Sequence, residues 1–135
     1  MTAPGRPGGV HHVSIQVRDL PRMEAFYVGV LQLPELKRWP GHDGERSVWL
    51  DLGGGAILAL ERMPGGAPAH AADWETDVAG LHVLALGITR DERADWEARL
   101  ASAGVAVAHR TPYSLYLRDP EGNRIGLSHW PDAEM

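Results

Sequence analysis

The chain has 135 residues, no cysteine and a formal net charge of −5 at pH 7. The length fits one compact domain, the missing cysteines exclude disulfides and thiolate metal sites, and the acidic balance disfavours a nucleic acid or an anionic membrane as partner. No apolar run is long enough to span a membrane, and residues 1–9 lack the apolar segment of a signal peptide, so we expect a cytoplasmic protein.

The first half predicts a leader, a strand and a helix. Residues 1–9 are rich in Pro and Gly, which predicts a flexible leader. Residues 12–17 alternate polar and apolar side chains, as a half-buried strand does. Asp19 offers an N-cap for the following helix, Pro21 fits its first turn, and Pro34 ends it.

A strand pair and a connecting segment follow. Residues 45–52 and 55–62 predict two strands that are joined by a glycine-rich turn. Residues 63–80 are rich in Gly, Pro, Ala and acids and show no sustained period. This composition predicts a linker, or a lid over the site.

The second half predicts the same order of elements. Thr89 and Glu92 form a capping box at a helix start, and Gly104 is a suitable stop. The Asp-Pro-Glu-Gly sequence at 119–122 predicts the turn between the last two strands. The strands of this half are predicted at residues 81–88, 105–109, 114–117 and 123–128.

The two halves also repeat one sequence pattern. Its parts are a His-Val pair at 12–13 and 82–83, a Ser-apolar-aromatic-Leu segment at 47–50 and 114–117, and an apolar-small-apolar segment at 58–60 and 125–127. A repeat of roughly 65 residues is too long for a solenoid. We therefore predict an α+β fold of two βαβββ modules, at residues 10–62 and 81–130, within one domain at residues 10–131.

Strand parity predicts which side chains carry chemistry. In each strand one face must meet the helix of its module, and the other face can line a shared concave pocket. Small residues on the concave face leave room beside a few polar and aromatic groups, which suits a small-molecule ligand. The predicted concave set includes His12, Ser14, Trp49, Ala59, Glu61, His82, Leu84, Leu86, Tyr116, Arg124 and Gly126.

Within this set, substrate binding is assigned to Ser14, Trp49, Leu84, Tyr116 and Arg124. Trp49 and Tyr116 occupy repeat-related positions and are predicted to stack on a ligand, although both could equally be core residues. Arg124 would recognise a carboxylate or a phosphate if it points inward, and would otherwise be a solvated charge on a strand.

Two segments carry a resemblance to a known family. His12 to Leu20, followed by Phe26-Tyr27, resembles the opening of the vicinal oxygen chelate superfamily, and Asp119 to Ile125 resembles its closing motif. That superfamily includes glyoxalase I, extradiol dioxygenases and bleomycin-resistance proteins. The resemblance covers the chain from about His12 to Trp130. It implies a curved mixed sheet around a concave pocket, with helices outside, and a homodimer.

The resemblance also bears on metal binding. In metal-dependent members the ligands come from the first and last strands of each module, which implies His12 and His82 as first-strand ligands. The last-strand carboxylate positions fall on Ala59 and Gly126, which cannot bind a metal. Glu61 could supply a displaced third ligand. The implied cofactor is therefore one divalent ion (Zn, Ni, Mn or Fe) at His12, His82 and Glu61, or no metal at all.

Two functions stay open on this basis. One is a glyoxalase- or dioxygenase-like enzyme, in which His12, His82 and Glu61 are catalytic and a metal or an imidazole activates the substrate. The other is a metal-free protein that sequesters a planar small molecule, as bleomycin-resistance proteins do. The two histidines favour the enzyme slightly, and the missing carboxylates favour the binding protein. The sequence names no substrate, and it leaves open whether the modules pair within one chain or across a dimer.

Overall fold

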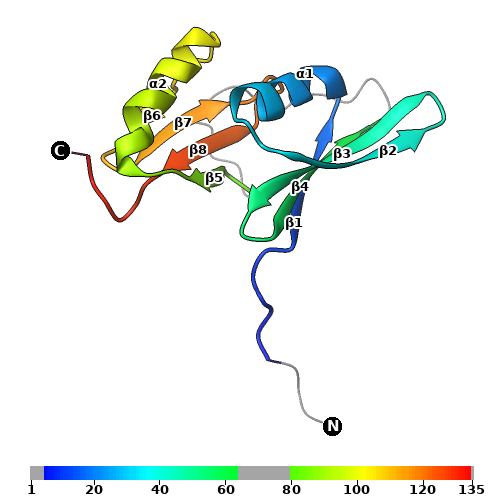
Figure 1. The fold of residues 1–135 in the computed structure, drawn as a ribbon, viewed down its shortest axis with the longest axis horizontal. Coiled ribbons are helices and arrows are strands. Elements are labelled where there is room, and N and C mark those ends of the chain that lie inside the picture. Colours follow the sequence, from blue (N-terminus) through cyan, green and yellow to red (C-terminus); the bar gives the residue numbers. More distant parts are fainter. Residues whose placement is uncertain (1–4, 64–79, 135) are drawn as a thin grey trace.

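The computed structural model describes residues 5–63 and 80–134. Within them lie two modules, each with a four-stranded mixed sheet and a helical segment, which confirms the predicted α+β fold (Figure 1). The strands form two separate sheets, whereas one curved sheet was expected. Most of the predicted linker or lid, at 64–79, and the first part of the predicted leader, at 1–4, lie outside the described residues.

The first sheet has the strand order β1-β4-β3-β2, with β1 parallel to β4 and the other pairs antiparallel. Three of its strands lie where the sequence predicts them, whereas the remaining strand of the predicted βαβββ order, β2, was not located in the sequence. Pro40 and several charged residues hide the strand pattern there, and an edge strand tolerates a proline because its outer backbone groups need no ladder partner. The strands are β1 (His12–Val17), β2 (Glu35–Gly41), β3 (Gly44–Gly53) and β4 (Ala56–Arg62).

The second sheet repeats this topology in the order β5-β8-β7-β6, with β5 parallel to β8. Two of its strands differ from the prediction: of residues 81–88 only Leu84–Gly87 form a strand, and of residues 105–109 only His109 does, in a strand that continues to Arg110. The turn before the last strand is formed as expected, because the Gly122 N–H donates to the Asp119 carbonyl at 3.0 Å. The strands are β5 (Leu84–Gly87), β6 (His109–Arg110), β7 (Ser114–Arg118) and β8 (Arg124–Ser128).

Both helices begin at the predicted caps. The Asp19 carboxylate accepts the Arg22 N–H at 3.1 Å and starts α1 (Leu20–Glu24), which continues as a π-helix, η1 (Ala25–Val30). In the second module the capping box of Thr89 precedes a short 3-10 turn, η2 (Arg90–Glu92), and then α2 (Arg93–Ser102). Gly104 follows α2 with a φ of 73°, a conformation that favours glycine.

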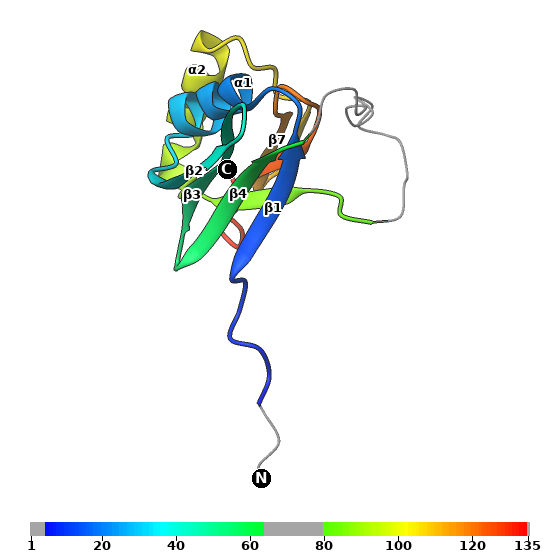
Figure 2. The ribbon, with the colours of Figure 1, turned by 90° about the vertical axis from the view of Figure 1, so that its right-hand side faces the viewer.

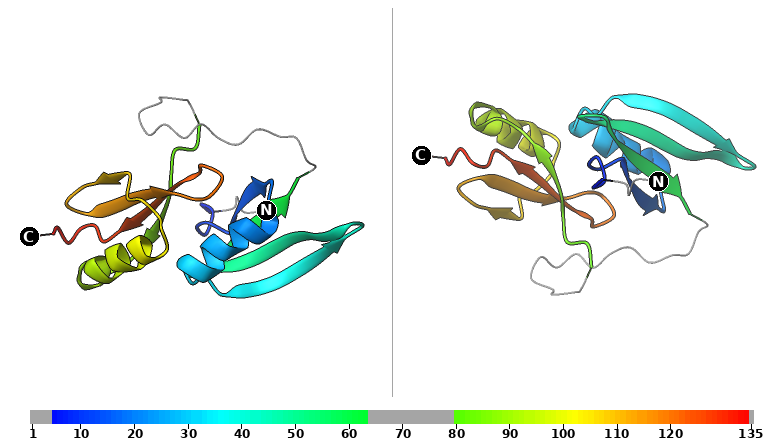
Figure 3. Two further views of the ribbon diagram at one scale, coloured as in Figure 1. Left: turned by 90° about the horizontal axis from the view of Figure 1, so that it is seen from above. Right: turned by 90° about the horizontal axis from the view of Figure 1, so that it is seen from below.

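Both helices lie on the same side of the two sheets, and the core lies between the helices and the sheets (Figures 1 and 2). The strand residues on the opposite face from the predicted concave set lie in this core, most of them fully buried. Seen from above or from below, the two modules lie side by side (Figure 3). The core strand residues with at most 1% exposure are Val17, Val48, Leu50, Leu58, Leu60, Leu115, Leu117, Ile125 and Leu127.

The turn between β7 and β8 fastens the second module to the first. The Tyr27 hydroxyl, on η1, donates to Asp119 Oδ2 at 2.6 Å, and both groups are buried. The Glu121 carboxylate accepts the N–H groups of Arg18 and Asp19, each at 2.8 Å, just before α1. We call Tyr27, Asp119 and Glu121 the turn clasp. Burial, and secondly the charge of Asp119, raise the pKa of Tyr27 well above its ordinary value.

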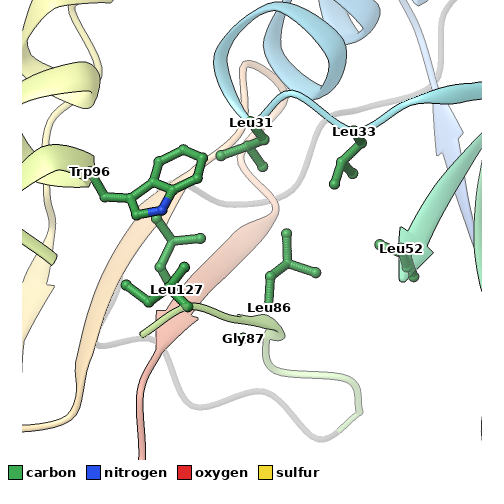
Figure 4. Close-up of a pocket in the computed structure, with 8 residues that line it drawn as sticks. Leu31, Leu33, Leu52, Leu86, Gly87, Trp96 and Leu127 are labelled. Carbon is green, nitrogen blue, oxygen red and sulfur yellow. The ribbon is translucent and has the colours of Figure 1, made fainter. Parts of the chain in front are cut away.

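The modules also meet beside their helices. The Arg99 side chain on α2 donates to the carbonyls of Val30 at 2.7 Å and Gly29 at 3.0 Å, and so satisfies the end of η1. An apolar hollow of about 120 Å³ lies next to this contact (Figure 4). Its lining includes Leu31, Leu52, Leu86, Trp96 and Leu127. No helix among the described residues is both long and apolar enough to cross a membrane.

Candidate ligand site on the open sheet faces

Each sheet has a face that points away from the helices, which we call its open face. Cross-strand register assigns the side chains to it, because partners in a ladder share a face. Across each open face runs a row in the order small, small, aromatic, basic. The row of the first sheet is Ser14, Ala59, Trp49 and Lys37. The row of the second sheet is Ala85, Gly126, Tyr116 and His109.

The register also corrects the predicted alignment of the two halves. Val13 pairs with Leu58, and Leu84 pairs with Ile125, so Leu84 is the counterpart of Val13. His82 is therefore the counterpart of His11, and the prediction that paired it with His12 is wrong by one residue. Since side chains alternate along a strand, this slip moves the whole strand to the other face.

The slip relocates two predicted pocket residues. Leu84 and Leu86 pack against the hydrophobic core, and Leu86 also lines the hollow between the modules, so their placement on the open face is wrong. Ala85 and Gly87 face the open side in their place. The alternation of large and small residues from Leu84 to Ile88 is the sequence signal that indicates this register.

Trp49 belongs to an aromatic cluster that includes a tryptophan the sequence analysis missed. Its ring centroid lies 5.1 Å from that of Trp39, on β2, with an interplanar angle of 59°. Lys37 Nζ lies 4.2 Å from the centroid of the Trp39 ring, within cation–π distance. Both tryptophans are half-buried. Trp39 was missed because β2 itself was not predicted.

Tyr116 lies across Gly126. A Cβ atom placed on Gly126 would lie 3.0 Å from Tyr116 Cε1, 3.2 Å from its Cδ1 and 3.3 Å from Ala85 Cβ. The tyrosine ring therefore occupies the space into which a side chain at position 126 would project. Tyr116 also stacks on the exposed His109 ring, with the two centroids 6.0 Å apart.

The two predicted histidines have different neighbours. His12 is exposed on the open face at the start of β1, and its Nδ1 lies 3.0 Å from His11 Nδ1. His82 precedes β5, and its Nδ1 lies 3.1 Å from Arg124 Nη1. The guanidinium can only donate, so Nδ1 of His82 is the acceptor in this contact. The structure thus joins His82 with Arg124.

Glu61 lies far from His12 on the first sheet. Glu61 pairs with Gln16, whereas His12 pairs with Ile57, four residues earlier on β4. At the usual rise of a strand this separation is about 13 Å. In the part of the chain that the structure describes, no three His, Cys, Asp or Glu residues are grouped so that they could hold a metal ion. His12, His82 and Glu61 therefore do not fit a three-ligand site.

A carboxylate introduced by Gly126→Glu tests this fit. We expect the affinity for Zn²⁺ to change by less than about threefold, because Tyr116 fills the space beside position 126 and His82 is out of register. The measurement is a competition titration against a chromophoric chelator, with circular dichroism to check the fold. The double variant Tyr116→Ala/Gly126→Glu gives the carboxylate room and serves as the control. A tenfold rise in Zn²⁺ affinity in both variants would contradict this expectation, because it would show that His12 and His82 converge on position 126.

The chain is similar to proteins of one superfamily. The family profile for the glyoxalase/bleomycin resistance protein/dioxygenase superfamily matches residues 9–127. A comparison with functionally curated proteins finds no match. Among solved structures, a glyoxalase/dioxygenase from Nostoc punctiforme is 26% identical with a TM-score of 0.78, and the match covers 94% of each chain.

Two other structures extend this similarity. A glyoxylase/bleomycin resistance protein/dioxygenase domain from Frankia sp. EAN1pec is 29% identical, with a TM-score of 0.72 over 91% of this chain and 98% of that one. The fosfomycin resistance protein FosX from Listeria monocytogenes, solved with Mn(II) and 1S,2S-dihydroxypropylphosphonic acid, shares the fold at 17% identity, with a TM-score of 0.71 over 92% and 94% of the two chains. The profile spans most of the chain, and the chain therefore belongs to the glyoxalase/bleomycin resistance protein/dioxygenase superfamily.

Proposed function

We propose that this protein binds a planar small molecule on the open faces of its two sheets. The observation that carries the proposal is the repeated row of small, small, aromatic and basic residues across each open face. Tyr116 covers Gly126 and Ala59 is 3% exposed, so the surface that each row offers to a ligand is the aromatic ring, which is suited to stacking. The predicted ligand contacts Trp49, Tyr116, Ser14 and Arg124 belong to this site.

The proposal needs no metal held by the protein. Ala59 and Gly126 stand at the positions where metal-dependent relatives were expected to carry carboxylates, and Tyr116 fills the space beside one of them. Because neither Ala59 nor Gly126 has a side chain that can bind a metal, these positions favour sequestration over metal-dependent glyoxalase or dioxygenase chemistry. A homodimer, as the family resemblance implies, and a cytoplasmic location, as expected from the composition, are part of this proposal.

A glyoxalase- or dioxygenase-like enzyme is the second candidate, and His12 is the residue that favours it. Its imidazole lies on the open face, where it can reach a bound ligand and move a proton without a metal. Replacement by His12→Gln would abolish turnover in an enzyme and would leave equilibrium binding within about twofold in a binding protein.

The substitution Trp49→Ala tests the binding site. We expect it to weaken the binding of 2-naphthol, a planar probe, at least tenfold, because it removes one of the two stacking surfaces. Titrations followed by fluorescence measure the affinity, and urea unfolding measures the stability. The matched control is Trp96→Ala, on α2, which packs against the core and should cost about 3 kcal/mol of stability without a loss of affinity. Equal losses of affinity and stability in Trp49→Ala would mean that Trp49 is a core residue.

A further inference from the structure

In the part of the chain that the structure describes, three buried hydrogen-bond donors on the first sheet have no acceptor. They are the Nε1 groups of Trp39 and Trp49 and the hydroxyl of Ser47. Ser47 is 0% exposed, so its hydroxyl is closed to bulk solvent. Buried polar groups in native proteins are nearly always hydrogen-bonded, and a group of exceptions calls for a physical reason.

The three donors are neighbours on one face. Trp39 pairs directly with Ser47 across β2 and β3, and Trp49 follows Ser47 by two residues, which places it on the same face of β3. The rings of Trp39 and Trp49 are 5.1 Å apart. We call Trp39, Ser47 and Trp49 the donor cluster. The three donors therefore share one region of this face, and each donor atom is closed to solvent in this structure.

The charge beside the donor cluster indicates what kind of group it accepts. Lys37 pairs with Trp49, and its ammonium lies 4.2 Å from the centroid of the Trp39 ring. An indole N–H and an ammonium can only donate, so three of these four side chains require an acceptor. Two acidic residues share this face: Glu61 pairs with Ser47 from β4, and Asp51 follows Trp49 by two residues on β3. On the side of β2 the charge beside the cluster is the ammonium of Lys37.

We propose that the donor cluster binds the acceptor oxygen of the ligand, and that a planar carboxylate is the ligand class it takes. This inference rests on the proposed function, because the ring of the same ligand would stack on the open face. A carboxylate offers two oxygens with about four lone-pair sites, which is enough to satisfy all three donors. Hydrogen bonds to an ionised acceptor are also the stronger kind, and Lys37 compensates the charge.

The experiment compares two probes that share a ring. 2-Naphthoate carries the carboxylate, and 2-naphthylmethylammonium replaces it with a donor. We expect naphthoate to bind at least tenfold more tightly to the unmodified chain. Trp39→Phe keeps an aromatic ring and removes one donor, and Ser47→Ala removes another. Each should lower the affinity for naphthoate about fivefold to tenfold and change that for the ammonium probe by less than twofold. Trp96→Phe, remote from the cluster, is the matched control.

The outcomes separate the two proposals. If neither probe nor 2-naphthol binds, the proposed function fails. If both probes bind with similar affinity, or if Trp39→Phe and Ser47→Ala leave the preference for naphthoate unchanged, the site binds planar molecules and only the donor cluster is refuted. Circular dichroism verifies that each variant is folded. Glu61→Gln gives an independent check, because removing its charge should strengthen naphthoate binding and weaken that of the ammonium probe.

Discussion

Replacing Asp119 by alanine is expected to lower the free energy of unfolding by about 3–5 kcal/mol. Asp119 is 4% exposed, and its carboxylate accepts four hydrogen bonds. The donors are the Tyr27 hydroxyl at 2.6 Å, the N–H groups of Glu121 and Asn123 at 2.9 Å, and Asn123 Nδ2 at 2.7 Å. Alanine leaves these donors without their acceptor and also releases the turn clasp between the modules.

Urea unfolding of the purified variants measures this loss. Asp119→Asn retains one acceptor oxygen, so its free energy of unfolding should fall less than that of Asp119→Ala. Asp132→Ala, at an exposed position near the C-terminal end, is the matched control and should change stability by less than about 0.5 kcal/mol. A loss below about 1 kcal/mol in Asp119→Ala would mean that the clasp does not hold the modules together.

Alkaline pH is expected to destabilise the fold through Tyr27. Burial and the charge of Asp119 raise the pKa of the folded tyrosine, while the unfolded chain titrates near pH 10. The unfolded state therefore releases the proton first. The contribution of Tyr27 is fully present below about pH 10 and is lost as the pH rises toward the folded pKa, with a slope of about 1.4 kcal/mol per pH unit.

The variant Tyr27→Phe isolates this contribution from the other groups that titrate in the same range. It should be less stable than the unmodified chain near neutral pH, since the Asp119 carboxylate loses a donor. Above pH 10 the two stability curves should converge. Denaturant unfolding at a series of pH values measures both. Parallel curves up to pH 11 would contradict the role assigned to Tyr27.

The fold was predictable because its signals are local. Period-2 alternation identified β1, and the caps at Asp19 and Thr89 identified both helix starts. The β2 strand was not predictable by the same means, because an edge strand with Pro40 needs neither a strict alternation nor a complete set of backbone donors.

The site was harder to predict because it depends on register. A His-Val pair occurs in both halves, but the strand pairing makes Val83, and not His82, the counterpart of His12. Sequence similarity between the halves does not contain this information, whereas the hydrogen-bonded pairing does. Trp49 and Tyr116 were placed correctly on the open faces, since the parity of β3 and β7 follows from buried leucines on either side.

The most direct test of the account is a titration with 2-naphthol in two states of the same preparation. One sample is dialysed against a strong chelator, and the other is supplied with excess Zn²⁺. We expect saturable binding in both, with affinities that agree within about twofold, because the aromatic rows bind the ring without a metal. Binding that occurs only in the sample with Zn²⁺ would contradict metal-free binding and would mean that the ligand site on the open faces requires a metal.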